Sequence, residues 1–158
     1  MEEIKTKFKK SFFDLIKELR NERVNMKIKI TGNSMAPFLS KGEEIIITPY
    51  NNNIKLKNGI IVLAETDKKK AILHRITKIH NDYYIIRGDN NIYSTETIKD
   101  SDIIGIATHI VRNNKVVSLY TPTKLIASHL WQWSFLRKIY HIFIYILKKW
   151  NHDYSCRF

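Results

Sequence analysis

The sequence predicts a mainly β fold, with a folded antiparallel sheet between a short N-terminal helix and a long amphipathic C-terminal helix. Two patterns predict it. Between residues 26 and 119, short β-branched runs, several of them alternating apolar and polar residues, are separated by turns rich in Gly and Asn. Before and after this region, the apolar residues instead recur at helical spacing. Short strands joined by tight turns are typical of a sheet that closes or folds on itself.

The N-terminal helix is predicted over residues 8–19, where apolar side chains recur at helical spacing among lysines. From Met26 the period changes to two, because Met26, Ile28 and Ile30 alternate with lysines. Further strand-like runs follow, separated by turn signals such as the Gly-Asp-Asn-Asn sequence at 88–91. The predicted strands are residues 26–30, 44–48, 59–65, 71–80, 83–87, 103–112 and 115–119.

Residues 125–149, after Pro122, are predicted to form one long helix with a narrow basic stripe and a wide apolar and aromatic face. Arg137 and Lys138 would fall near the middle of a bilayer, which argues against a simple transmembrane helix. The pattern is that of a helix lying in a membrane interface. It also fits a helix packed on the sheet or a dimerisation helix, and the sequence alone leaves these three interpretations open.

Length and composition restrict the class of protein. The 158 residues fit one compact unit, in which we expect an N-terminal amphipathic helix (1–25), a β domain (26–120) and a basic C-terminal helix (121–158). The net charge of +12 admits nucleic acid or an anionic membrane surface as a partner. The single cysteine, Cys156, excludes a disulfide framework and a cysteine-built zinc site. Because the sequence has neither a metalloprotease histidine pair nor a nucleotide-binding glycine motif, we expect no metal and no cofactor.

A serine, a histidine and a carboxylate in three separate segments suggest nucleophilic catalysis. Ser34 follows a predicted strand, His74 lies within a later one, and several acidic residues follow Gly88. A serine hydroxyl becomes a good nucleophile when a histidine accepts its proton, and a carboxylate on the far ring nitrogen fixes the tautomer. Each residue also has a structural interpretation, with Ser34 as a turn or cap residue and His74 as a partly buried packing residue.

In this order, the motifs resemble those of the signal peptidase I superfamily, whose β-rich fold is shared with the LexA-type self-cleaving repressors. Ser34-Met35-Ala36-Pro37 matches the Ser-Met-x-Pro motif of the family's nucleophile, with Gly42-Glu43 where Gly-Asp is expected. His74-Arg75 matches the His-Arg pair of the endoplasmic-reticulum-like branch, where bacterial members have a lysine base. Gly88-Asp89-Asn90 matches the family's Gly-Asp-Asn segment. The resemblance covers roughly residues 26–110 and implies a signal peptidase/LexA-like folded β-sheet barrel.

The same resemblance implies where the orienting acid lies. In the family this acid follows the Gly-Asp aspartate by six or seven residues, and at seven this chain has Glu96. Glu96 is therefore the first choice for the acid that orients the histidine, and Asp89 is the second. Alternatively, Asp89 only holds the turn. Asp100 and Asp102 are close enough in sequence to remain candidates.

Two departures from the family pattern concern the anchor and the oxyanion hole. Typical members carry an N-terminal membrane anchor, whereas this chain has only the short helix predicted over 8–19. Many relatives have a hydroxyl two residues before the nucleophile, and this chain has Gly32 there. The oxyanion hole would then rest on the N–H of Ser34, with Asn33 or Thr31 as further donors. Losing one donor costs about 10²–10³ in rate, so we expect a slow enzyme or a different second donor.

We therefore predict a serine endopeptidase that cleaves a leader or signal segment from a peptide or protein precursor. Ser34 would attack the scissile carbonyl, His74 would transfer the proton, and Glu96 or Asp89 would orient His74. The alternative is a non-catalytic basic module on the same scaffold, docking to membrane or nucleic acid. Nucleic acid is the less favoured partner, because the residues before the first strand are too few for a helix-turn-helix and a linker. We expect a cytoplasmic location, where residues 125–149 could contact the inner face of the cell membrane.

Overall fold

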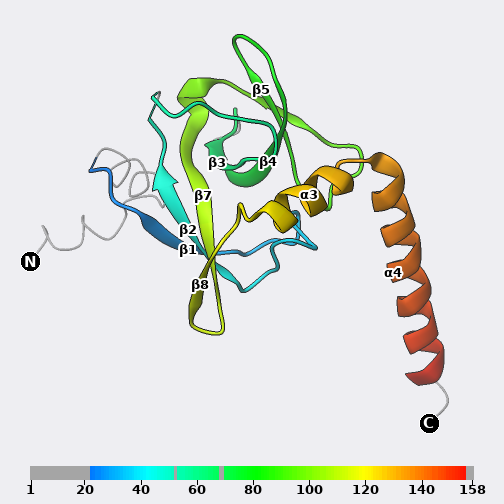
Figure 1. Ribbon diagram of the computed structural model, residues 1–158. Coiled ribbons are helices and arrows are strands. Elements are labelled where there is room, and N and C mark those ends of the chain that lie inside the picture. Colours follow the sequence, from blue (N-terminus) through cyan, green and yellow to red (C-terminus); the bar gives the residue numbers. More distant parts are fainter. Residues whose placement is uncertain (1–21, 52, 68–69, 156–158) are drawn as a thin grey trace, which may run out of the picture.

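In the described part of the chain, eight strands form one curled antiparallel sheet, and two helices follow it (Figure 1). The computed structural model describes residues 22–51, 53–67 and 70–155, apart from the side chains of 134 and 148–155. The helix predicted over 8–19 lies outside these residues. The predicted mainly β fold is confirmed. The elements are β1 (Met26–Lys29), β2 (Glu44–Pro49), β3 (Ile61–Glu65), β4 (Ala71–Ile79), β5 (Tyr84–Arg87), β6 (Glu96–Ile98), a 3-10 helix (Asp100–Asp102), β7 (Ile103–Arg112), β8 (Lys115–Ser118), α3 (Pro122–Trp131) and α4 (Ser134–Ser155).

The sheet curls because its longest strands change partners along their length. The strand order is β1-β2-β7-β3-β4-β5-β6, and β8 pairs with β7. The first half of β4 pairs with β3 and its second half pairs with β5, and Arg75, next to His74, is the residue that pairs with both strands. Register shifts at Ile46/Ile47, Leu63/Ala64 and Ile76/Lys78 mark irregularities of the kind that bend strands.

The core consists mostly of isoleucine, leucine and valine side chains from the strands. One cluster of buried residues includes Met35 and Leu39, which come from the loop after β1 and pack with Ile45 and Ile110 of the sheet. Burying apolar side chains of this size stabilises a fold by about 1.5–3 kcal/mol each. The loop between β1 and β2 is therefore anchored in the interior by its own residues. A second cluster lies around Ile76, Ile86, Ile98 and Ile103.

The predicted strand ends agree with the observed ones to within two residues, and one strand was missed. β6 is only three residues long, too short for an alternating pattern to be visible in the sequence. It forms because Tyr84, Ile85 and Ile86 of β5 pair with its three residues. The missed strand matters for the site, since its first residue is Glu96.

The single helix predicted over 125–149 is wrong in one respect, because α3 and α4 are separate helices. At the junction, the N–H groups of Gln132 and Trp133 donate to carbonyls three residues earlier, a tightening common at helix ends. The Arg137 side chain reaches back to the carbonyl of Gln132 at 3.3 Å. Ser134, a residue type favoured at helix starts, then begins α4. No helix in the described ranges combines the length and apolar character that crossing a membrane requires.

Candidate active site

Ser34 lies in the loop between β1 and β2, at a sharp turn of the chain. Hydrogen bonds from the Ala36 N–H to the Asn33 carbonyl (3.1 Å) and from the Leu39 N–H to the Met35 carbonyl (2.9 Å) hold this turn. Met35 and Leu39 are buried in the core. Because buried neighbours fix the turn on its inner side, the half-buried Ser34 has a defined position at the surface of the sheet.

His74 and Glu96 form the second part of the site. His74, on β4, is only 5% exposed, and its Nδ1 atom lies 2.9 Å from Oε2 of Glu96 at the start of β6. An ionised carboxylate can only accept hydrogen bonds, so Nδ1 carries the proton and donates it. In the neutral imidazole, the Nε2 atom then holds the free lone pair. This is the tautomer that a histidine needs to act as a general base toward a hydroxyl.

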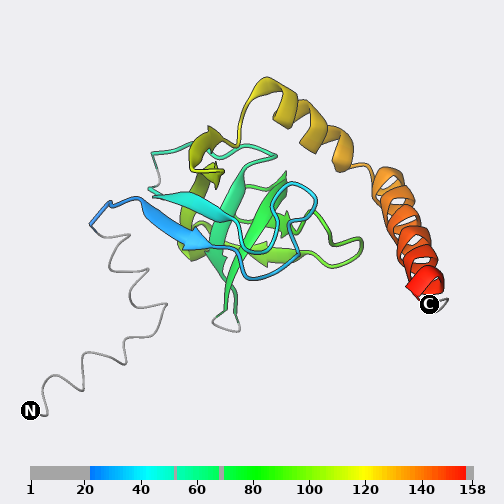
Figure 2. The same ribbon diagram turned by 90° about the horizontal axis from the view of Figure 1, so that it is seen from below.

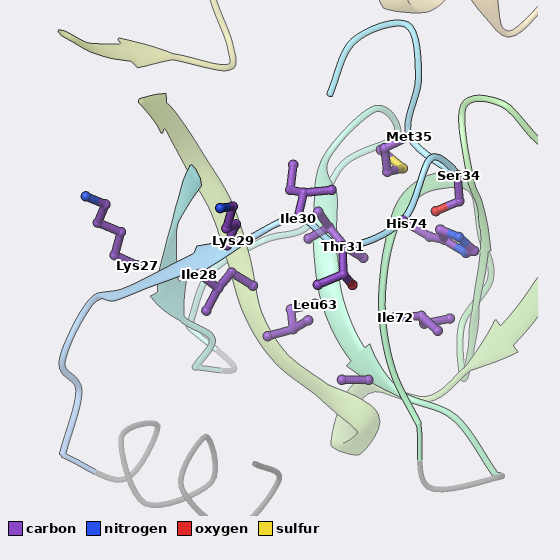
Figure 3. Close-up of a pocket in the computed structure, with 13 residues that line it drawn as sticks. Lys27, Ile28, Lys29, Ile30, Thr31, Ser34, Met35, Leu63, Ile72 and His74 are labelled. Atoms are coloured by element: carbon purple, nitrogen blue, oxygen red, sulfur yellow. The ribbon is translucent and has the colours of Figure 1, made fainter. Parts of the chain in front are cut away.

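The Nε2 atom of His74 faces the loop that carries Ser34. A Cβ added at Gly88 would lie 3.0 Å from His74 Nε2 and 2.6 Å from the Ser34 carbonyl oxygen, so both atoms border the same small space. The Asn90 N–H donates to that carbonyl at 2.8 Å. In Figure 3 the Ser34 hydroxyl and the His74 ring lie next to each other in the pocket that both residues line. The structure thus brings Ser34, His74 and Glu96 together from three segments of the chain.

A groove of about 710 Å³ leads to this pair of residues. Residues 27–32 form one wall and residues 71–74 of β4 form the other, with Leu63 between them (Figure 3). Within the described ranges, β1 pairs only with β2, and residues 71–74 pair only with β3. Each wall therefore presents one strand edge without a partner strand among these residues. Such an edge can hydrogen-bond an extended peptide as an additional strand.

Asp89, the second-choice acid, is paired with Arg75. Nε and Nη2 of Arg75 donate to the two carboxylate oxygens of Asp89 at 2.8 and 2.7 Å, and the two residues are 4% and 2% exposed. Arg75 also donates through Nη1 to the carbonyl of Gly59 at 2.7 Å, and its guanidinium lies 5.3 Å from the ring centre of Phe38. The Asp89 carboxylate thus holds the loop after β5 onto β4, while the carboxylate at Nδ1 of His74 belongs to Glu96.

The remaining acidic candidates have other partners. Asp100 accepts hydrogen bonds from the hydroxyls of Tyr50 (2.7 Å) and Tyr84 (3.1 Å). Burial, with the carboxylate of Asp100 as the next cause, raises the pKa of both tyrosines. Asp102 accepts from the N–H of Lys99 at 2.7 Å. Both aspartates therefore stabilise the turn around the 3-10 helix.

Glu43, which stands where the family pattern has aspartate, is a structural residue of the β1–β2 loop. It accepts hydrogen bonds from Nε of Arg112 at 2.6 Å and from the N–H of Ser40 at 2.7 Å. Burial by itself would raise the pKa of this carboxyl, but the Arg112 and Ser40 hydrogen bonds outweigh it, and the pKa is lowered. Glu43 thus ties the loop that carries Ser34 to the end of β7.

The region in front of Ser34 is open. Among the described residues, nothing lies within 4 Å of a Cβ added at Gly32, so these residues leave room for a larger side chain there. Of the two residues predicted as further oxyanion donors, Thr31 lines the groove with Ser34 and Gly32, and Asn33 is not among its lining residues.

Contacts between the C-terminal helices and the loop at 88–91 were not predicted from the sequence. Nε1 of Trp131 donates to the carbonyl of Asp89 at 2.8 Å, and Nη1 of Arg137 donates to the carbonyl of Asn91 at 3.1 Å. The Trp131 ring also packs edge-on against Phe38, with ring centres 5.9 Å apart. These partners are 42 and 46 residues apart, and no local pattern indicates such contacts.

Among the described residues, no group of three or more His, Cys, Asp or Glu side chains could hold a metal ion. A hydroxyl, an imidazole and a carboxylate are the groups that can serve as nucleophile, base and orienting acid in acyl transfer. A family model described as Peptidase S24-like matches residues 2–109, more than half of the chain. No curated protein matches the sequence.

Proposed function

The chain belongs to the Peptidase S24-like family, and on that premise we propose that it is a serine endopeptidase with Ser34 as nucleophile and His74 as general base. Family membership supports a serine peptidase or a self-cleaving fold. The Ser-His type of centre, similar to that of the endoplasmic-reticulum-like signal peptidases, is our proposal from the residues of this chain.

One observation carries the proposal, namely the hydrogen bond between Glu96 and Nδ1 of His74. In the neutral ring, the proton then lies on Nδ1, and Nε2, on the side that faces the Ser34 loop, is the nitrogen that can accept a proton. In the proposed reaction, Ser34 Oγ attacks the scissile carbonyl as His74 Nε2 takes its proton. His74 then returns the proton to the leaving amine, and water releases the acyl group by the same steps. Glu96 keeps the ring oriented and stabilises its charged form.

The proposed substrate is an extended segment of a peptide or protein precursor, such as a leader or signal sequence. Its backbone would pair with the strand edges of residues 27–30 and 71–74, as peptides do when they extend a sheet. The apolar residues Ile30, Met35 and Leu63 line the groove near Ser34 and would accept apolar substrate side chains.

The test is labelling and cleavage with matched serine variants. The full chain is treated with a fluorophosphonate and, separately, incubated with a peptide library whose products are sequenced by mass spectrometry. We expect the label on Ser34 and cleavage of the library by the wild type. Ser34→Ala should lose both, whereas Ser101→Ala, an exposed serine on the 3-10 helix, should keep both. Cleavage retained by Ser34→Ala would refute the assignment. If the wild type neither reacts nor cleaves, the scaffold is a non-catalytic binding module.

A further inference from the structure

The helix α4 exposes a continuous apolar stripe on its outer side. Phe135, Ile139, Ile142, Phe143 and Ile146 recur at spacings of three or four residues or lie next to each other, so they share one face. Each of these five side chains is between 52% and 59% exposed. A contiguous exposed patch of large apolar residues marks a surface that binds a partner.

The opposite side of α4 is already in use within the molecule. Arg137, which is 1% exposed, binds the carbonyl of Asn91, and Tyr140 packs edge-on against Trp131 with ring centres 5.1 Å apart. Beyond these contacts α4 extends away from the sheet (Figures 1 and 2). The inner side of the helix thus holds it on the protein, and the apolar stripe is left on the outside.

The charge of this region identifies the partner. The chain has no Asp or Glu between Asp102 and Asp153, whereas five Lys or Arg residues lie between positions 122 and 152. A helix with an apolar stripe of Phe and Ile, beside basic residues and without carboxylates, has the composition of helices that lie in the headgroup region of anionic membranes. A second copy of the chain fits this surface less well, because two segments of the same positive charge would face each other.

We propose that α4 docks flat on an anionic lipid membrane through the stripe of Phe135, Ile139, Ile142, Phe143 and Ile146. The insertion of the apolar side chains and the attraction of the lysines to lipid phosphates act together. The surface lies outside residues 2–109, which match the family. Because Trp131 and Arg137 tie the helical segment to the loop at 88–91, docking also holds the groove at a fixed distance from the lipid surface.

Vesicle flotation of the full chain tests this directly. Vesicles of phosphatidylcholine and phosphatidylglycerol in equal parts serve as the anionic probe, and vesicles of phosphatidylcholine alone serve as the neutral one. We expect the protein to float with the anionic vesicles and to be released from them as the salt concentration is raised. The fraction of protein bound to neutral vesicles should be lower by about tenfold or more. The double variant Ile139→Ser/Ile142→Ser should lose anionic binding by about tenfold or more, because two apolar anchors are removed.

Val116→Ser is the matched control, since Val116 is a 60% exposed apolar residue on β8, far along the chain from the stripe. It should bind vesicles like the wild type, and circular dichroism should show all variants folded. Equal binding of the double variant and the wild type would overturn the proposal, as would failure of the wild type to bind anionic vesicles. If light scattering shows a dimer for the wild type and a monomer for the double variant, the stripe is instead the interface with a second copy of the chain. Vesicle binding needs no cleavage activity, so its failure and failure of the proposed peptidase function are separate results.

Discussion

Nδ1 of His74 and Oε2 of Glu96 lie 2.9 Å apart, although 22 residues separate them in the chain. The contact depends on three neighbouring strands. Ile76 of β4 pairs with Ile86 of β5, and Ile86 in turn pairs with Glu96 of β6. The sheet register therefore places the Glu96 carboxylate beside the His74 ring.

Glu96→Gln should lower the rate of peptide cleavage by about 10²–10⁴, because the amide can donate to Nδ1 and favour the tautomer in which Nε2 is no longer basic. The thermal unfolding midpoint should hardly change, since the Glu96 side chain is about one third exposed and such pairs contribute about 0–1 kcal/mol. Cleavage assays and thermal melts of the same samples measure both effects. The control is Asp82→Asn, an exposed carboxylate in the β4–β5 turn. A Glu96→Gln variant that cleaves at the wild-type rate would contradict the assignment of Glu96.

Asp89→Asn should act chiefly on stability, in contrast to Glu96→Gln. The variant leaves the guanidinium of Arg75 buried without its counter-charge, and breaking such a pair from one side costs about 3–5 kcal/mol. Urea unfolding measures this loss in free energy of unfolding. An unchanged unfolding free energy together with a complete loss of cleavage would reverse the roles assigned to Asp89 and Glu96.

Gly88→Ala should impair both cleavage and stability, because its Cβ would lie 2.6 Å from the Ser34 carbonyl oxygen and 3.0 Å from His74 Nε2. Since the first neighbour is backbone, the loops must shift, and strain of this kind costs about 1–3 kcal/mol. The matched control for stability is Gly32→Ala, where a Cβ meets no atom of the described part of the chain within 4 Å. Urea unfolding compares the two variants, and equal unfolding free energies would show that the close approach at Gly88 is absent in solution.

The stability of the protein should fall above about pH 10 through Tyr50 and Tyr84. Burial, followed by the Asp100 carboxylate, raises the pKa of both hydroxyls, so the folded state retains protons that the unfolded chain releases. The stabilisation is fully present below the pKa that the two hydroxyls have in the unfolded chain. It is lost as the pH rises from there through their raised pKa values in the folded protein. Urea midpoints measured between about pH 7 and 11 should fall less steeply for Tyr50→Phe than for the wild type.

Loss of the hydrogen bond from the Tyr50 hydroxyl to Asp100 in Tyr50→Phe should also cost about 1 kcal/mol at neutral pH. Tyr93→Phe is the control, because Tyr93 is 84% exposed. If the urea midpoint falls equally steeply with rising pH in the wild type and in Tyr50→Phe, the Tyr50 hydroxyl does not cause the loss of stability at alkaline pH.

All strands except the three-residue β6, and the candidate nucleophile and base, could be predicted from local patterns. The alternation at Met26, Ile28 and Ile30 is visible within a few residues, and it is caused by the alternation of side chains between the two faces of a strand. The predicted motifs at Ser34 and His74 are equally local. The break between α3 and α4 was not predicted, because it depends on Arg137 reaching the carbonyl of Gln132 and the loop at 88–91, contacts that require the folded chain.

From the amino-acid sequence alone, a folded β sheet could be predicted, together with Ser34, His74 and a nearby acid as a set of residues that could act together. The partners of the two carboxylates are visible only in the folded chain, where Glu96 lies at Nδ1 of His74 and Asp89 pairs with Arg75. The physical reason is that strand register and the partners of a buried charge depend on residues far away in the chain. A carboxylate has the same chemistry at both positions, and its role is set by which cation or imidazole the fold brings to it.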